Sequence, residues 1–180
     1  GACGNVTVKI IDSTKDCSDA GLSSKVFPMG DGTNVTVAYF DSDVADEQIN
    51  TFNNLPVKAD LNRLRGIHGI KGYPSIDLGL YDGVGAITAV FAGIPFGKTH
   101  SGVTVLGTDV DSGGYLDQDS VTGAQAVGAS NAGDTAAFVH AGADLNLGDS
   151  LTAFVVGSKD DGANPPKFMI CKDFVEAANL

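Results

Sequence analysis

Hydrophobic and polar residues alternate with a period of two along most of the chain, as in strands that bury one face. Three short segments show this pattern clearly, at residues 6–10, 35–39 and 76–80. Further strand candidates cover residues 86–92, 102–108, 124–129, 135–141, 150–157 and 167–172. Many short strands at regular spacing are typical of β-sandwiches and barrels, so the pattern predicts an all-β fold.

Turn-forming residues separate the strand candidates. Gly, Asp, Ser and Pro cluster at residues 30–32, 81–83, 112–114, 160–162 and 165–166. These clusters predict tight turns between antiparallel strands. Short helices are expected only at residues 44–51 and 174–179.

The composition agrees with a turn-rich β protein. The acidic residues are twenty Asp and two Glu, against nine Lys and two Arg, and there are 24 Gly among 180 residues. Asp and Gly favour turns, whereas Glu and Arg favour helix interiors. The net charge of −11 disfavours a nucleic-acid surface or an anionic membrane as partner, and it makes basic groups or divalent cations the expected charged partners. The apolar runs are too short to cross a bilayer, so no transmembrane segment is predicted.

Four separated segments carry a family resemblance. They are RLRGIHGI at residues 63–70, YPSIDLGL at 73–80, VFAGIPFGKT at 90–99 and the C-terminal strands at 151–173. In this order they resemble the bacterial secreted family known as domain of unknown function 4397, although residues 69–71 depart from that family's usual Ala-Ser-Pro. The resemblance implies an exported immunoglobulin-like antiparallel β-sandwich, and it brings no catalytic residues with it.

The resemblance and a weak internal echo suggest the domain organisation. Residues 30–43 and 148–159 share a Gly-Asp turn, a Thr and an apolar strand. We therefore expect residues 1–62 to hold additional N-terminal strands, as a partial module or sheet extension. Residues 63–173 would form the sandwich, with 53–62 as a connection and 174–180 as a tail.

One acidic loop is a candidate calcium site. Asp109, Asp111, Asp117 and Asp119 lie close together in sequence, and calcium prefers several oxygen ligands from a flexible loop. The spacing is not that of an EF-hand, since Gly113 stands where a third ligand belongs and no bidentate Glu follows. An ordinary solvated loop is the alternative. No other cofactor is expected.

The sequence offers no catalytic constellation, so a non-enzymatic protein is predicted. His68, His100 and His140 are far apart, without the short spacing of a zinc site. Residues 128–132 come nearest to a G-x-S-x-G nucleophile turn and depart from it at the last position.

Three cysteines leave at least one unpaired within a monomer. A Cys17–Cys171 disulfide is the preferred pairing, because pairing Cys3 with Cys17 would require a hairpin inside the first strand. Cys3 then remains as a free thiol, an intermolecular bridge or a lipid anchor. The chain begins at Gly1 rather than Met, which suggests processing or trimming.

These features favour a structural protein at a bacterial cell surface or outside the cell. Residues 1–60 hold too few strands for a second sandwich, so we expect self-assembly into a filament or layer through the N-terminal strand at residues 4–11. The alternative is a surface module that binds carbohydrate or another ligand. Tyr73, Tyr81 and Tyr115 lie in predicted turns and are the candidate ligand platform.

Overall fold

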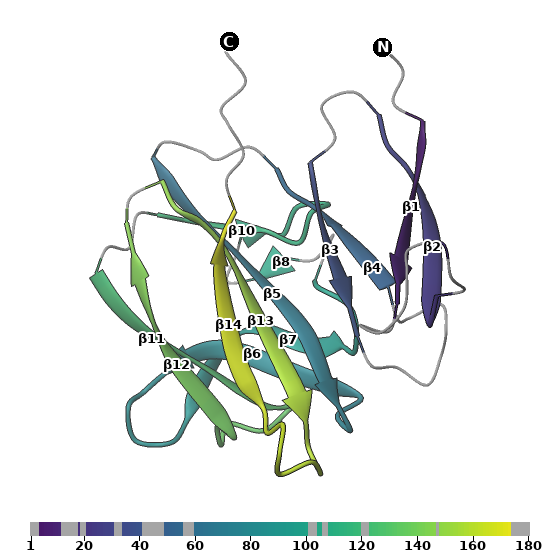
Figure 1. The fold of residues 1–180 in the computed structure, drawn as a ribbon. Coiled ribbons are helices and arrows are strands. Elements are labelled where there is room, and N and C mark those ends of the chain that lie inside the picture. Colours follow the sequence, from purple (N-terminus) through teal and green to yellow (C-terminus); the bar gives the residue numbers. More distant parts are fainter. Residues whose placement is uncertain are drawn as a thin grey trace. The chain divides into compact units, whose positions relative to one another are not determined.

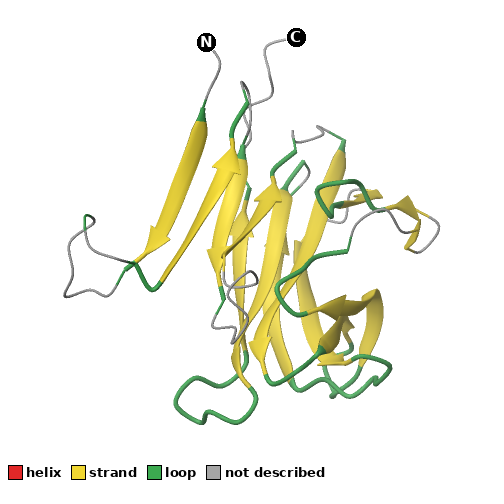
Figure 2. Ribbon diagram, turned by 90° about the vertical axis from the view of Figure 1, so that its right-hand side faces the viewer, coloured by secondary structure: helices red, strands yellow, loops and turns green. Residues whose placement is uncertain are grey.

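The computed structural model describes residues 4–11, 18, 21–30, 34–40, 49–55, 60–100, 104–105, 108–119, 123–146 and 148–173. Strands and loops make up this described part, which contains no helix (Figure 2), so the predicted all-β fold is confirmed. In particular, the described residues include no helix long and apolar enough to span a bilayer. Contacts divide the chain into two compact units, Gly1–Asn54 and Leu55–Leu180. The division falls within the connection expected at residues 53–62.

The N-terminal unit contains two antiparallel two-stranded sheets. Their strands are β1 (Asn5–Ile10) with β2 (Ser23–Pro28), and β3 (Val35–Tyr39) with β4 (Ile49–Asn53). The Lys25 ammonium in β2 donates a hydrogen bond of 3.0 Å to the Ile49 carbonyl in β4. Two small sheets are thereby joined within this unit.

The C-terminal unit contains two four-stranded sheets (Figure 1). The first sheet has the order β10-β5-β13-β14 and the second sheet has the order β12-β11-β6-β7. Their bounds are β5 (Leu61–Lys71), β6 (Ser75–Tyr81), β7 (Ile87–Pro95), β10 (Leu116–Asp119), β11 (Gly123–Asn131), β12 (Val139–Leu145), β13 (Ser150–Ser158) and β14 (Lys167–Lys172). A separate short hairpin joins β8 (Thr104–Val105) to β9 (Thr108–Asp109).

The two four-stranded sheets pack face to face around one apolar core. The buried cluster draws on both sheets and consists of Ile70, Ile76, Leu78, Phe91, Ile94, Val110, Leu116, Ala129 and Val155. The sheets approach closely at Gly66 in β5, where an added Cβ would lie 2.4 Å from Leu78 Cδ1. The unit is therefore a β-sandwich, and glycine is required where its layers touch.

One strand pair differs from the predicted antiparallel arrangement. Strands β5 and β13 run parallel, from the Arg63–Ser150 pair to the Lys71–Ser158 pair, and the other named pairs are antiparallel. A parallel pair needs a long crossover connection. Here the second sheet supplies it, because β6, β7, β11 and β12 lie between β5 and β13 in sequence.

Aspartate carboxylates build several of the predicted turns. Asp82 Oδ1 accepts hydrogen bonds from the backbone N–H groups of Val84, Gly85 and Ala86 at 2.9, 3.0 and 2.9 Å. Backbone hydrogen bonds, led by that of Ala86, lower the pKa of Asp82. Asp161 Oδ1 accepts from Ala163 N in the same way. Part of the acidic charge thus serves local chain geometry.

Several predicted element bounds need correction. The helix expected at residues 44–51 is wrong at its described end, since Ile49–Asn53 forms β4 and buries Ile49 and Phe52. The strand expected at 135–141 instead covers Val139–Leu145. The alternation pattern did not predict β2, β4, β5 or β10, and the short strands β8 and β9 stand where one strand was expected at residues 102–108. The candidate helix at 174–179 lies outside the described residues.

Candidate functional site

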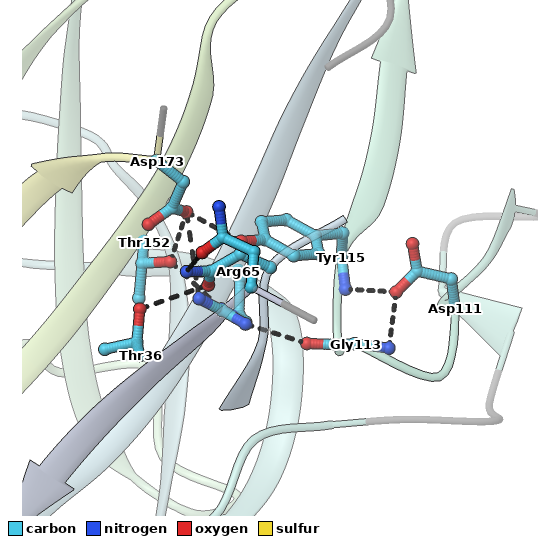
Figure 3. Close-up of polar contacts among 9 residues, drawn as sticks. Thr36, Arg65, Asp111, Gly113, Tyr115, Thr152 and Asp173 are labelled. Carbon is cyan, nitrogen blue, oxygen red and sulfur yellow. Dashed lines mark hydrogen bonds and ion pairs between the residues drawn. The ribbon is translucent and has the colours of Figure 1, made fainter. Parts of the chain in front are cut away.

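A group of polar side chains gathers on the outer face of the first sheet (Figure 3). Side chains alternate along a strand, so Leu64 and Gly66 of β5 face the core while Arg63 and Arg65 point to the opposite side. We call the following set the polar cluster: Arg63, Arg65, Asp111, Tyr115, Asp117, Thr152 and Asp173. It joins β5, β10 and β13 to the loop before β10 and to the residue after β14.

Arg65 lies at the centre of the polar cluster and is 1% exposed. Its Nε donates to Thr152 Oγ1 at 2.9 Å, and its Nη1 donates to the Gly113 carbonyl at 3.2 Å. Its Nη2 lies 3.8 Å from Asp173 Oδ2. Burial lowers the pKa of Arg65. The ordinary pKa of a guanidinium is so high that the group nevertheless stays charged. A buried cation is therefore held by a carboxylate and two neutral acceptors.

Tyr115 covers this guanidinium from the loop before β10. The Arg65 guanidinium carbon lies 4.3 Å from the Tyr115 ring centroid, within the range of a cation–π contact. The Tyr115 hydroxyl donates to Asp173 Oδ2 at 2.8 Å, and Thr152 Oγ1 donates to the same oxygen at 2.5 Å. Burial raises the pKa of Tyr115 to about 12. The phenol is thus a neutral hydrogen-bond donor near neutral pH.

Arg63 binds two of the four predicted calcium ligands. Its Nε donates to Asp117 Oδ1 at 2.8 Å, and its Nη2 pairs with Asp111 Oδ2. Asp111 Oδ1 also accepts from the backbone N–H groups of Gly113 and Tyr115 at 2.8 and 2.9 Å. In this structure a protein cation therefore occupies the position that calcium would need at these two carboxylates.

The other two predicted calcium ligands are Asp109 and Asp119. Asp109 ends β9, and Asp119 ends β10 at an exposed position. Among the described residues, no group of three or more acidic, His or Cys side chains is arranged to hold a metal ion. Calcium binding by Asp109, Asp111, Asp117 and Asp119 stays a prediction, and calorimetry with calcium against a chelated sample tests it.

The arrangement of the polar cluster suits mechanical linkage. Two guanidinium groups lie among three carboxylates, and the tyrosine and threonine hydroxyls both donate to Asp173. These contacts tie the loop before β10 and the chain after β14 to the face of the first sheet. Sequence reasoning did not assign a role to Arg63 or Arg65, although a signal was present: they are the only arginines, two residues apart on one strand.

The three histidines lie in separate places. His68 is fully buried, where its Nδ1 accepts from Ile70 N at 3.2 Å and its Nε2 pairs with the Tyr73 carbonyl at 2.9 Å. Burial lowers the pKa of His68, so the neutral ring fills a structural position. His100 Nε2 contacts the Ala92 carbonyl. These bonds engage His68 and His100 with the backbone.

The predicted tyrosine platform is corrected in one member. Tyr115 is 0% exposed, because it packs over Arg65 and Arg63, and it presents no face to a ligand. Tyr73 is half-buried and stacks on Phe138 at 4.7 Å, with the Lys159 ammonium 5.0 Å from its centroid. The remaining candidate, Tyr81, belongs to a different ring pair.

Tyr81 stacks on His140 across a glycine. The ring centroids are 4.3 Å apart with an angle of 3° between the planes. Gly128 of β11 pairs with His140 of β12, and an added Cβ there would approach Tyr81 Cβ to 3.4 Å and Ile87 Cγ2 to 2.6 Å. The missing side chain at residue 128 leaves room for the stacked rings. Tyr73 and Tyr81 remain predicted ligand contacts.

The cysteine predictions fall mostly outside the described residues. Cys3 and Cys17 both lie there, whereas Cys171 is exposed on β14 and carries a free thiol. As the strand alternation predicts, Cys171 lies on the face opposite Phe168 and Ile170, which are half-buried. The free thiol of Cys171 gives the Cys17–Cys171 disulfide no support in this structure, and that pairing and the intermolecular or lipid role of Cys3 stay predictions.

Exposed apolar side chains concentrate in the N-terminal unit. Among the described residues, eight large hydrophobic side chains are exposed, and five of them belong to this unit: Val6 (47%), Leu22 (69%), Val26 (55%), Val37 (42%) and Tyr39 (43%). The unit spans less than a third of the chain, so apolar exposure is several times denser there than in the sandwich.

A scan against protein-family models finds none that matches this chain, and no curated protein matches it either. The resemblance to domain of unknown function 4397 therefore stays a hypothesis.

Proposed function

We propose that this chain is a non-enzymatic structural protein of an extracellular or cell-surface assembly. In this assembly the N-terminal strand, β1, of one chain adds to an open strand edge of the next chain. The proposal is carried by one observation: the N-terminal unit is built from two-stranded sheets that expose large apolar side chains.

The physical reason is the marginal stability of such sheets. An isolated two-stranded sheet is barely stable in water, and three or more strands with a buried apolar face are usually needed. In the described part of the chain, β1 pairs with β2 and β3 pairs with β4, so each of these strands has one strand partner. An added strand supplies backbone hydrogen bonds and covers apolar side chains at the same time.

Side-chain patterning on β1 suits such an addition. Val6, Val8 and Ile10 lie on one face of β1, and Phe27 of β2 shares that face in register with Val6. Val6 is 47% exposed, whereas Val8 and Ile10 are half-buried. A neighbouring strand with apolar residues at alternate positions would extend this face.

The kind of contact decides the kind of assembly. When an edge of one chain joins a different edge of the next, the contact is heterologous, and it gives a filament where the rotation between successive chains does not close a ring. The net charge of −11 opposes association by self-repulsion. Assembly through an apolar strand edge should therefore increase with ionic strength, because salt screens that repulsion.

The finer assignments belong to the same proposal. An immunoglobulin-like identity for the sandwich, export from the cell and membership of the 4397 family all rest on the motifs at residues 63–80, 90–99 and 151–173. They agree with an acidic, turn-rich β protein that works outside the cell.

The test compares two valine-to-lysine variants of the full chain. Val6→Lys places a charge on the exposed apolar face of β1, and we expect it to abolish assembly. Val84→Lys is the matched control, because Val84 is 88% exposed in a turn of the sandwich unit. Light scattering over a concentration series and negative-stain microscopy provide the measurements. A wild-type chain that stays monomeric at high concentration and forms no fibres contradicts the proposal, as does unchanged assembly of Val6→Lys.

A ligand-binding sandwich is the second candidate function. A specific observation favours it: the sandwich holds an apolar cavity between its sheets.

A further inference from the structure

The cavity lies inside the C-terminal unit, between the two four-stranded sheets. Its volume is about 180 Å³, and all eight strands of the two sheets contribute to its lining. Its apolar lining residues include Leu64, Leu80, Val127, Ala143, Ala153 and Ile170. The cavity is therefore a feature of the sandwich interior rather than of a surface loop.

The packing of the two sheets explains why space remains there. The layers touch at Gly66 and Leu78, where an added Cβ has no room. Farther along the second sheet, Leu80 lines the cavity and is nevertheless 49% exposed. Ala143 and Ala153 are small residues at inward positions on β12 and β13, where larger side chains would fill the gap. The partial exposure of Leu80 indicates that the cavity opens to solvent at this residue.

The lining is apolar and uncharged. Its polar side chains are the neutral amides of Asn62, Gln118 and Gln125. Arg65 also lines the cavity, but its guanidinium lies on the other face of the first sheet, in the polar cluster, so it contributes backbone here. An ionised ligand would lose its hydration in this space without a counter-charge to replace it. The chemistry therefore selects a neutral ligand.

The size and the backbone pairing identify the kind of occupant. An apolar cavity of about 150 Å³ holds a benzene molecule, so 180 Å³ fits an aromatic ring or a short alkyl chain. A polypeptide strand fits poorly, because the backbone groups of the lining strands already pair within their own sheets. An inserted strand would bury its own N–H and C=O groups without partners.

We propose that this cavity binds a small neutral apolar molecule, with a ring or short alkyl body and at most one uncharged polar group. Gln118 and Gln125 are among the lining residues, and the amide of either can accept or donate one hydrogen bond to that group. This site lies in the sandwich and does not depend on strand addition by the N-terminal unit.

Three probe molecules test the proposal on the full-length chain. Toluene, hexanol and hexanoate have comparable apolar bodies and differ in polarity and charge. We expect toluene and hexanol to raise the melting temperature and to shift the methyl resonances of Leu80, Val127 and Ile170 in a saturable manner. Hexanoate should produce neither effect at the same concentration. Methyl shifts that are equal for hexanoate and hexanol, or absent for all three probes, overturn the proposal.

A cavity-filling variant and a matched control locate the binding. Ala153→Leu should fill the space and weaken hexanol binding at least about tenfold. Ala124→Leu makes the same change at an exposed position of β11 and should leave binding unchanged. If Ala153→Leu does not fold, Ala143→Val fills the same space with a smaller addition. Retained binding in a folded filling variant overturns the proposal. Ligand-free methyl shifts that depend on protein concentration in the assembly-blocked Val6→Lys variant overturn it too, because these would show a second copy in the cavity. Val6→Lys should retain the binding.

Discussion

Removing the Arg65 guanidinium tests whether it neutralises a buried carboxylate. The side chains of Arg65 and Asp173 are 0% and 5% exposed. Truncating one partner of a buried pair costs about 3–5 kcal/mol, because the other charge stays buried. Asp173 keeps its hydrogen bonds from Tyr115 and Thr152 in Arg65→Met, so we expect the lower end, about 3 kcal/mol. With a urea m-value of about 2 kcal/mol/M, the unfolding midpoint should fall by about 1.5 M.

The assay is urea unfolding followed by far-ultraviolet circular dichroism, with two comparison variants. The double variant Arg65→Met/Asp173→Asn also removes the buried carboxylate charge of Asp173. Part of the stability lost in Arg65→Met should therefore return in the double variant, and the difference measures the coupling energy of the pair. Lys172→Met breaks the Lys172–Asp149 pair of 3.0 Å, in which the lysine is 45% exposed. That surface pair should contribute no more than about 1 kcal/mol. A loss in Arg65→Met no larger than in Lys172→Met, or a coupling energy near zero, refutes the role given to Arg65.

Three further predictions concern buried groups. The pKa of His68 is lowered by burial, so the unfolded chain takes up its proton first as the pH falls below about 6.5. The urea midpoint should therefore drop in that range, and His68→Gln should weaken this pH dependence. Because the folded pKa of Tyr115 is about 12, a spectrophotometric titration should show one tyrosine that ionises at higher pH than the others, and Tyr115→Phe should abolish that step. The stability of the fold should decline as the pH rises above the unfolded tyrosine pKa of about 10. Gly66→Ala should destabilise the sandwich by about 1–3 kcal/mol through overpacking. Gly142→Ala should be nearly neutral, since an added Cβ there meets only a Gln125 oxygen at 4.0 Å. Equal urea midpoints for the two variants would show that the sheets can separate at Gly66.

Local patterning of apolar and polar residues predicted five of the strands closely. Strands β1, β3, β6, β13 and β14 lie within a residue or two of the expected segments. Strand β2 was missed because Lys25 occupies a half-buried position between Ser23 and Phe27, and its ammonium donates to the Ile49 carbonyl. A lysine at that position hides the alternation from sequence inspection. Strand β10 has one apolar residue, Leu116, and depends on pairing with β5.

The polar cluster was less predictable because its partners are distant in sequence. Spacing alone places Arg63 and Arg65 on one face of a strand. Their carboxylate partners lie 48 or more residues away, and only the tertiary fold selects Asp111, Asp117 and Asp173 among twenty aspartates. Tyr115 was expected to be exposed because it follows two glycines in a turn. Instead, the Tyr115 ring is buried because it packs on the Arg65 guanidinium of β5.

The parallel pairing of β5 with β13 has a consequence for the order of folding during synthesis. Arg65 and Thr152, partners in this pair, are separated by 87 residues. A growing chain that has reached β12 already contains every strand of the second sheet, but β5 has only β10 beside it. Contacts of such long sequence separation form slowly, because the chain between them must first be brought together. A nascent chain should therefore keep the edge of β5 that pairs with β13 open until Ser150–Ser158 has left the ribosome, and it would depend on chaperones during that interval.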